Sequence, residues 1–133
     1  MNKISENGNL KKRIGLPLVI WAIINMIAGV FYLFPSSELV KGVLLQAFFW
    51  GLIDGIIGLV ALLRKKAFEL KKIKKIFLIN VYLDVVYIII GTLLILFSNN
   101  AFLIGNGYGV SIQGLFLFVV DVIHNAHVKK LLK

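Results

Sequence analysis

Four apolar blocks, each about as long as a membrane-spanning helix, make up most of this sequence. They cover residues 14–34, 43–63, 76–97 and 108–128. A hydrocarbon core of about 30 Å is crossed by about 20 apolar residues in a helix, which is the length of each block. The chain is 59% apolar and only 16% charged, whereas soluble domains carry about 25% charged residues. The sequence therefore predicts an all-α integral membrane protein with four transmembrane helices.

The positive charges lie between the apolar blocks and follow a regular alternation. Basic residues cluster in 11–13, 64–75 and 129–133, whereas the other two connections carry only Glu38 and Lys41. The positive-inside rule places the three basic clusters in the cytoplasm. We therefore expect an antiparallel bundle with cytoplasmic N and C termini, in a bacterial cytoplasmic membrane. The basic segments would contact anionic lipid head groups, so the net charge of +9 does not indicate a nucleic-acid partner.

Three regions are predicted along the chain. Residues 1–13 form a basic cytoplasmic N-terminus, which we expect to be disordered, residues 14–128 form the transmembrane domain, and residues 129–133 form a basic cytoplasmic tail. Pro17 falls in the first turn of the first span, where its missing N–H is tolerated. Residues 98–107 read as an outer connection ending in a flexible Gly-Asn-Gly turn. The chain lacks cysteine, which excludes disulfides, thiolate metal sites and cysteine nucleophiles.

A polar layer crosses the middle of the four spans. Asn25, Asp54, Asp84 and Asp121 each lie 8–12 residues from the nearest basic cluster, or roughly 12–18 Å along a helix. A carboxylate at mid-membrane costs about 2.5–3.5 kcal/mol, so it usually faces a partner, a cavity or a ligand. Three ionised carboxylates in a low dielectric would repel one another, so we expect at least one to be protonated or neutralised by a bound cation.

The candidate ligand- or ion-binding residues extend this layer. The Asp residues would supply charge, the amides neutral ligands, and the aromatic rings walls that can contact a cation. The full predicted set is Trp21, Asn25, Trp50, Asp54, Asn80, Asp84, Tyr87, Gln113 and Asp121. Asp121 and His124, three residues apart, are the weaker candidates for a metal ion. A hydrogen-bonded polar core is the other explanation for that pair, and we expect no cofactor.

Three short strings carry a resemblance to a known family. They are Trp50-Gly51-Leu52-Ile53-Asp54, Leu83-Asp84-Val85-Val86-Tyr87 with Gly91, and Gln113-Gly114 followed by Asp121. They resemble the motifs of an uncharacterised bacterial family of small four-helix integral membrane proteins, a domain of unknown function, over about residues 14–125. The resemblance implies a bacterial membrane protein with a four-helix fold, and it names no substrate.

Three functions fit these features. The leading hypothesis is a transporter or channel that binds a cation, a proton or a cationic small molecule at the Asp layer. One subunit offers little room for a wide path, so we expect a homo-oligomer or a subunit of a larger membrane complex. The alternative is a non-transporting accessory or interaction subunit whose polar layer sets helix packing. A membrane enzyme for a lipid-like substrate is the third, although no Ser-His-Asp or phosphate-loop arrangement is visible.

Overall fold

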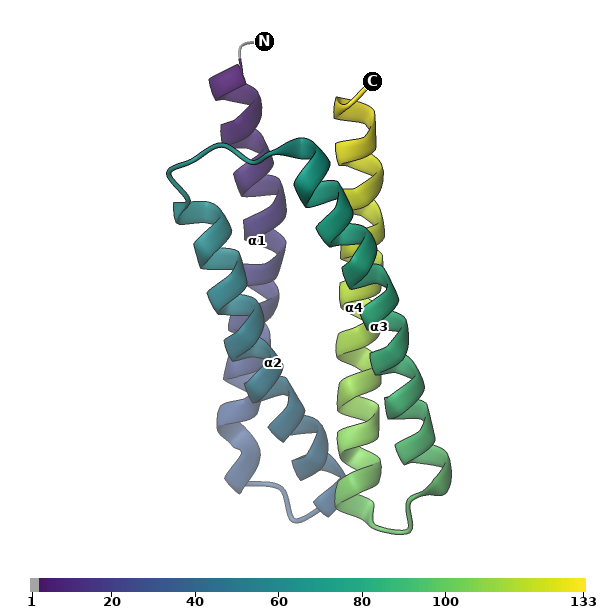
Figure 1. Cartoon of the computed structure of the whole chain (residues 1–133). Helices are drawn as coiled ribbons and strands as arrows, with labels where there is room; N and C mark the ends of the chain where they lie inside the picture. The colour runs from purple at the N-terminus through teal and green to yellow at the C-terminus, as the bar shows by residue number, and fades with distance from the viewer. Residues whose placement is uncertain (1–2) are drawn as a thin grey trace.

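The computed structural model describes residues 3–133, with side chains described from Gly8 onwards. It is all-helical (Figure 1). The elements are α1 (Lys3–Val30), the short 3-10 helix η1 (Phe31–Leu33), α2 (Glu38–Leu63), α3 (Leu70–Phe97) and α4 (Ala101–Leu131). Each of the four α-helices contains a segment long and apolar enough to cross a membrane. The predicted architecture of four long apolar helices is thereby confirmed.

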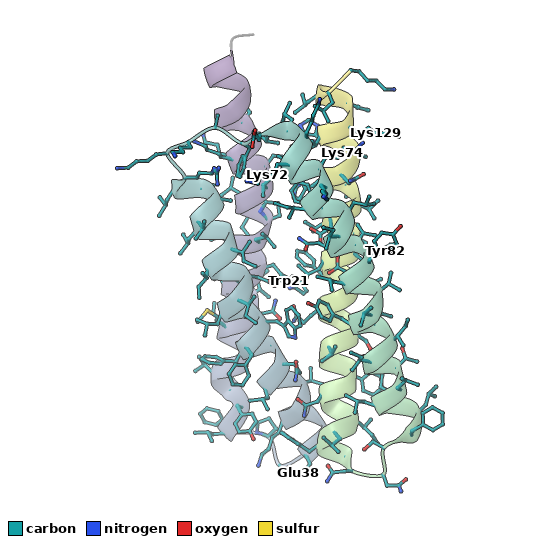
Figure 2. All side chains as sticks on the ribbon, in the orientation of Figure 1. Trp21, Glu38, Lys72, Lys74, Tyr82 and Lys129 are labelled. Carbon is teal, nitrogen blue, oxygen red and sulfur yellow. The ribbon has the colours of Figure 1, made fainter. Side chains whose placement is uncertain are left out.

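The bundle consists of two helical pairs. α1 packs along α2, α3 packs along α4, and the two pairs meet mainly through α2 and α4. Figure 1 shows both termini at the same end of the molecule as the connection from α2 to α3. Figure 2 shows Lys72, Lys74 and Lys129 toward this end and Glu38 at the opposite end. The bundle therefore has one strongly basic end, which we call the basic end.

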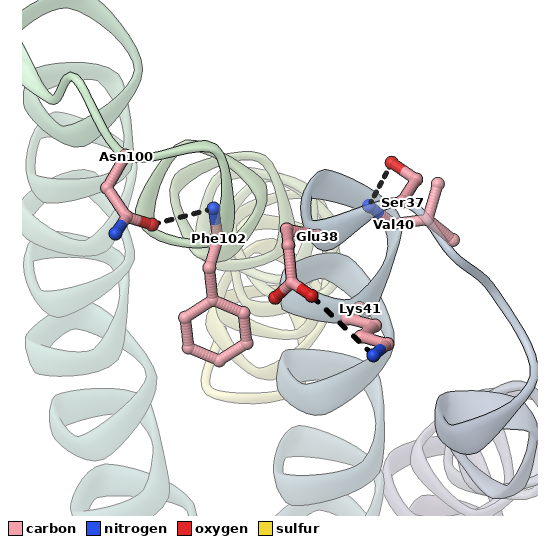
Figure 3. Close-up of polar contacts among 6 residues, drawn as sticks. All are labelled: Ser37, Glu38, Val40, Lys41, Asn100 and Phe102. Atoms are coloured by element: carbon pink, nitrogen blue, oxygen red, sulfur yellow. Dashed lines mark hydrogen bonds and ion pairs between the residues drawn. The ribbon is translucent and has the colours of Figure 1, made fainter.

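Side-chain caps begin two of the helices at the opposite end (Figure 3). The Val40 N–H donates to Ser37 Oγ at 3.3 Å, and Asn100 Oδ1 accepts from the Phe102 and Leu103 N–H groups at 2.9 and 3.2 Å. The first N–H groups of a helix have no partner within the helix, so such caps stabilise its start. Because Asn100 caps α4, this helix begins at Ala101.

The Gly-Asn-Gly segment at 105–107 lies inside α4, not in an outer turn as the sequence suggested. All three residues are buried. A Cβ on Gly107 would lie 2.7 Å from the Gly91 carbonyl oxygen of α3, and one on Gly105 would overlap Leu39 of α2. Glycines of this kind allow membrane helices to pack backbone against backbone. The close approach of α4 to both neighbours explains why this segment is helical.

The start of α1 also differs from the sequence expectation. The helix begins at Lys3, so it includes most of the segment 1–13 that we predicted to be disordered, while residues 1–2 lie outside the described part. Leu10 and Ile14 are buried in an apolar cluster with Phe77 and Val128 near the basic end. This packing supports the early turns. Pro17 consequently lies well inside α1 instead of in its first turn.

Polar and apolar side chains are distributed unlike those of a soluble protein. Large apolar side chains such as Ile20, Ile56 and Leu96 are more than half exposed on the outside of the bundle. Among the side chains described from Gly8 onwards, seven polar or charged residues are buried instead: Asn25, Asp54, Asp84, Asn106, Gln113, Asp121 and His124. An exposed apolar surface of this extent marks an interaction site or a lipid-facing surface. The interior is therefore where a polar site is to be sought.

Candidate functional site

The carboxyl groups of Asp54, Asp84 and Asp121 line one pocket. It has a volume of about 320 Å³ and takes wall residues from all four helices and from Phe68 of the α2–α3 connection. α2 supplies Asp54, α3 supplies Asp84 and α4 supplies Asp121. Three acidic residues that are separated by 30 and 37 positions in the sequence therefore line one pocket in the bundle.

These carboxyl groups are buried and incompletely paired. Asp54, Asp84 and Asp121 are 1%, 2% and 8% exposed. Asp54 Oδ2 and Asp84 Oδ2 have no hydrogen-bond partner among the described residues. An ionised carboxylate accepts hydrogen bonds and donates none, so these unpaired oxygens are available to a donor.

Aromatic and amide groups complete one side of the pocket. Trp50 of α2 and Tyr87 of α3 both line it, and their rings meet edge to face with centroids 5.0 Å apart. The Trp50 ring is held in place because its Nε1 donates to Gln46 Oε1 at 3.0 Å. Asn80, one turn before Asp84 on α3, lines the same pocket. Six of the nine predicted ligand-binding residues thus line this pocket.

His124 also lines the pocket, three residues after Asp121 on α4. It is buried, and neither ring nitrogen has a hydrogen-bond partner among the described residues. Its ring centroid lies 5.2 Å from that of Phe77. The sequence singled out His124 only as a possible metal ligand with Asp121. In the part of the chain that the structure describes, no group of three or more His, Cys, Asp or Glu side chains is arranged to hold a metal ion.

The remaining three predicted residues form a separate hydrogen-bonded cluster, which we call the amide cluster: Trp21, Asn25 and Gln113. Trp21 Nε1 donates to Gln113 Oε1 at 2.8 Å, and Gln113 Nε2 donates to Asn25 Oδ1 at 2.6 Å. Asn25 Nδ2 donates to the Trp21 carbonyl oxygen at 2.7 Å. None of the three lines the pocket. Their polar groups are used to join α1 to α4, whereas the pocket carboxyls retain free acceptors.

A second polar chain lies outside the predicted set of ligand-binding residues. Gln46 Nε2 donates to Asn106 Oδ1 at 2.7 Å, and Asn106 Nδ2 donates to the Phe102 carbonyl oxygen at 2.8 Å. Together with the bond from Trp50, this chain links the pocket wall on α2 to α4. Gln46 lies four residues before Trp50 and eight before Asp54, so its helical spacing was a usable signal. Asn106 was missed because Gly-Asn-Gly usually indicates a turn.

Arg64 and Phe68 line the pocket on the side that faces the basic end of the bundle. The Arg64 guanidinium lies over the Phe68 ring, 4.9 Å from its centroid. Its Nε donates to the Lys66 carbonyl oxygen at 3.1 Å, and Lys11 Nζ donates to the Arg64 carbonyl oxygen at 2.5 Å. Arg64 is therefore engaged at the pocket margin, and none of the three Asp carboxyls forms an ion pair with a described basic side chain.

Comparison with known proteins places these features in a family. The model of a family of unknown function, DUF6992, matches residues 17–122. This range includes the amide cluster and all three pocket carboxyls. No curated protein and no solved structure matches the chain significantly. The match confirms the resemblance to an uncharacterised family that the sequence motifs indicated.

Proposed function

Because the chain belongs to DUF6992, a family of unknown function, we propose its function from the pocket itself: it binds a cationic organic molecule at the three carboxyls and transports it. The observation that carries this proposal is the convergence of Asp54, Asp84 and Asp121 on one pocket, where none of them forms an ion pair with a basic side chain that the structure describes. Buried acidic groups need a counter-charge or protons. A bound cation supplies that counter-charge.

The size of the pocket favours an organic molecule over a bare ion. Its volume of about 320 Å³ is close to the lower end of the range of about 300–1,000 Å³ that is typical of small-molecule sites. A water molecule occupies about 30 Å³ in the liquid, so a single ion would leave most of the space unfilled. The Trp50 and Tyr87 rings add surfaces that attract organic cations.

The proposed membrane arrangement follows from the charge distribution. The basic end carries Lys72, Lys74 and Lys129 (Figure 2), and the positive-inside rule supports a cytoplasmic location for it. Both termini are then cytoplasmic, and successive helices cross a bacterial cytoplasmic membrane in antiparallel directions. The basic residues contact anionic head groups there. One small bundle has little room for a transport path across the membrane. We therefore propose that the path is formed by a homo-oligomer or by a complex with another membrane subunit.

A specific observation also favours the alternative of a non-transporting interaction subunit. The amide cluster satisfies its polar groups internally and joins α1 to α4. Buried polar groups that pair in this way can set helix register without binding anything. In that case the pocket carboxyls would belong to the same packing layer, and a partner membrane protein would be the ligand.

Binding and transport by the purified protein distinguish these functions. In phosphatidylcholine nanodiscs, decylammonium should raise the thermal unfolding midpoint of the wild-type protein more than the neutral decanol does. Asp54→Asn and Asp84→Asn should abolish this difference, whereas Glu38→Gln should preserve it, because the exposed Glu38 lies at the opposite end and pairs with Lys41 there.

In proteoliposomes, a concentration jump of decylammonium should give a current that requires the wild-type protein and is lost in Asp54→Asn. If the wild-type protein responds to decylammonium and decanol alike and carries no current, the transport proposal is wrong. A search for a protein partner then becomes the test of the interaction subunit.

A further inference from the structure

We infer that the pocket selects primary alkylamines, molecules with N–H donors on a cationic head and an apolar chain, over quaternary ammonium ions. This inference rests on the proposed function and specifies its ligand class. It is carried by the unpartnered polar atoms of the pocket wall and by the place where the pocket meets the outside of the bundle.

The chemistry of the ligand's cationic head group is inferred from pocket atoms that lack hydrogen-bond partners. Asp54 Oδ2, Asp84 Oδ2 and both ring nitrogens of His124 are buried, and none has a partner among the described residues. All three residues line the same pocket. Buried polar groups are normally hydrogen-bonded, and each exception calls for an explanation. A bound molecule with several N–H groups would pair the two carboxyl oxygens and the one ring nitrogen of a neutral His124 that accepts a hydrogen bond.

A primary ammonium group fits this set better than other cations. It carries three N–H donors, as the Lys side chain does, whereas a quaternary ammonium group carries none. Both attract the Trp50 and Tyr87 rings, so the rings alone do not discriminate between them. A site built to hydrogen-bond an N–H strongly rejects an analogue that lacks it, because its own buried groups then stay unpaired. We therefore expect Asp54, Asp84 and His124 to discriminate between primary and quaternary ammonium ions.

The apolar chain is indicated by the outer margin of the pocket. Several wall residues on α2 and α3 are large, apolar and more than 40% exposed: Ile53, Ile57, Val60, Ile76 and Leu83. α2 and α3 do not pack along one another, since each pair is joined to the other mainly through α2 and α4. The pocket thus opens between α2 and α3 onto the apolar outer surface, where an alkyl chain would continue into lipid.

The opposite margin disfavours access by a cation. Arg64 lies there with its guanidinium over Phe68, and the surrounding basic end carries many more positive charges. A cationic head would be repelled along that route, because like charges raise its energy wherever water screens poorly. Access between α2 and α3 avoids this charge and keeps the alkyl chain in an apolar environment throughout.

The test compares three ligands with the same decyl chain in phosphatidylcholine nanodiscs. Decylammonium should bind at least tenfold more tightly than decyltrimethylammonium, as measured by the concentration that gives half of the maximal rise in unfolding midpoint. Decanol measures the effect of the chain alone. Asp54→Asn and His124→Phe should each reduce the ratio between the two cations. Tyr82→Phe, on a side chain that points away from the bundle (Figure 2), should leave it unchanged.

The outcomes separate the two proposals. Equal affinity for both cations, a preference for the quaternary ion, or a ratio unaffected by both pocket variants would overturn the inference while leaving an organic-cation site intact. Responses to both cations no larger than that to decanol would overturn the proposed function as well.

The same ammonium chemistry occurs in a lipid head group. Adding phosphatidylethanolamine to the nanodiscs, without free amine, tests that source. A rise in the midpoint that Asp54→Asn abolishes would identify the lipid as the primary amine, whereas no rise would leave a free alkylamine as the ligand.

Discussion

Gln113 Nε2 lies 2.6 Å from Asn25 Oδ1, and this hydrogen bond joins α4 to α1. Both residues are buried, and Gln113 also accepts from Trp21 Nε1. α1 otherwise packs mainly on α2. The amide cluster is therefore the principal polar connection between the first and last helices, and it lies apart from the acidic pocket.

Gln113→Ala should destabilise the protein by about 1–2 kcal/mol, because it removes the hydrogen-bond partner of Trp21 Nε1 and of the buried Asn25 Oδ1. The measurement is the free energy of unfolding in detergent, together with a double-mutant cycle that combines Gln113→Ala with Trp21→Phe. The two changes should be less destabilising together than the sum of their separate effects, since both remove one bond. Strictly additive effects would show that the bond contributes nothing.

Gly105→Ala should lower the free energy of unfolding by about 1–3 kcal/mol, because a Cβ there would overlap the backbone of Leu39 on α2. Backbone atoms cannot move aside as the end of a side chain can. The matched control is Gly8→Ala in α1, where no atom lies within 4 Å of the new Cβ. That change should be stabilising by up to about 1 kcal/mol, because alanine favours helix. Equal responses at the two positions would contradict the close packing of α2 and α4.

Asp54→Leu should raise the free energy of unfolding by about 1–3 kcal/mol while ligand binding is lost. Asp54 is almost fully buried with an unpaired oxygen, and apolar replacement of such groups is often neutral or stabilising. Glu38→Gln removes the exposed carboxylate that pairs with Lys41 at 3.6 Å, and it should change stability by less than about 1 kcal/mol. A destabilised Asp54→Leu protein would instead assign Asp54 to packing.

Single cysteines should report the sidedness of the protein without interference, since the chain contains none of its own. A membrane-impermeant maleimide added to intact cells should label Asn99→Cys, between α3 and α4. Lys66→Cys, at the basic end, should be labelled only after the membrane is permeabilised, and Lys129→Cys should behave in the same way. Labelling of all three positions from outside would refute the proposed orientation.

The number and type of the helices were predictable because they depend on local properties. The length and apolarity of 43–63 or 76–97 are properties of each segment alone, and α2 and α3 include those segments. Helix ends were less predictable. α4 begins at Ala101 because Asn100 caps it and because Gly105 and Gly107 meet neighbouring backbones, and contacts between helices are not visible in a local pattern.

The candidate site, like the helices, could be predicted only in part from local properties of the sequence. Similar distances from the basic clusters were enough to place Asp54, Asp84 and Asp121 at about one depth, and the structure brings them to one pocket. The same reasoning grouped them with Asn25 and Gln113, which bond to each other elsewhere. The depth of a residue in the membrane depends on its position along its own helix. Its hydrogen-bond partners depend on how that helix is rotated about its axis relative to the other helices.

The sequence by itself therefore determined four long apolar helices and the acidic residues within them, because hydrophobic length and spacing are encoded locally. Only the tertiary structure decided which polar groups are satisfied and which stay free. It pairs Trp21 with Gln113, Gln113 with Asn25, and Gln46 with Asn106. It leaves unpaired atoms on Asp54, Asp84 and His124 in the pocket, because hydrogen bonding is settled by distances between side chains that packing alone brings together.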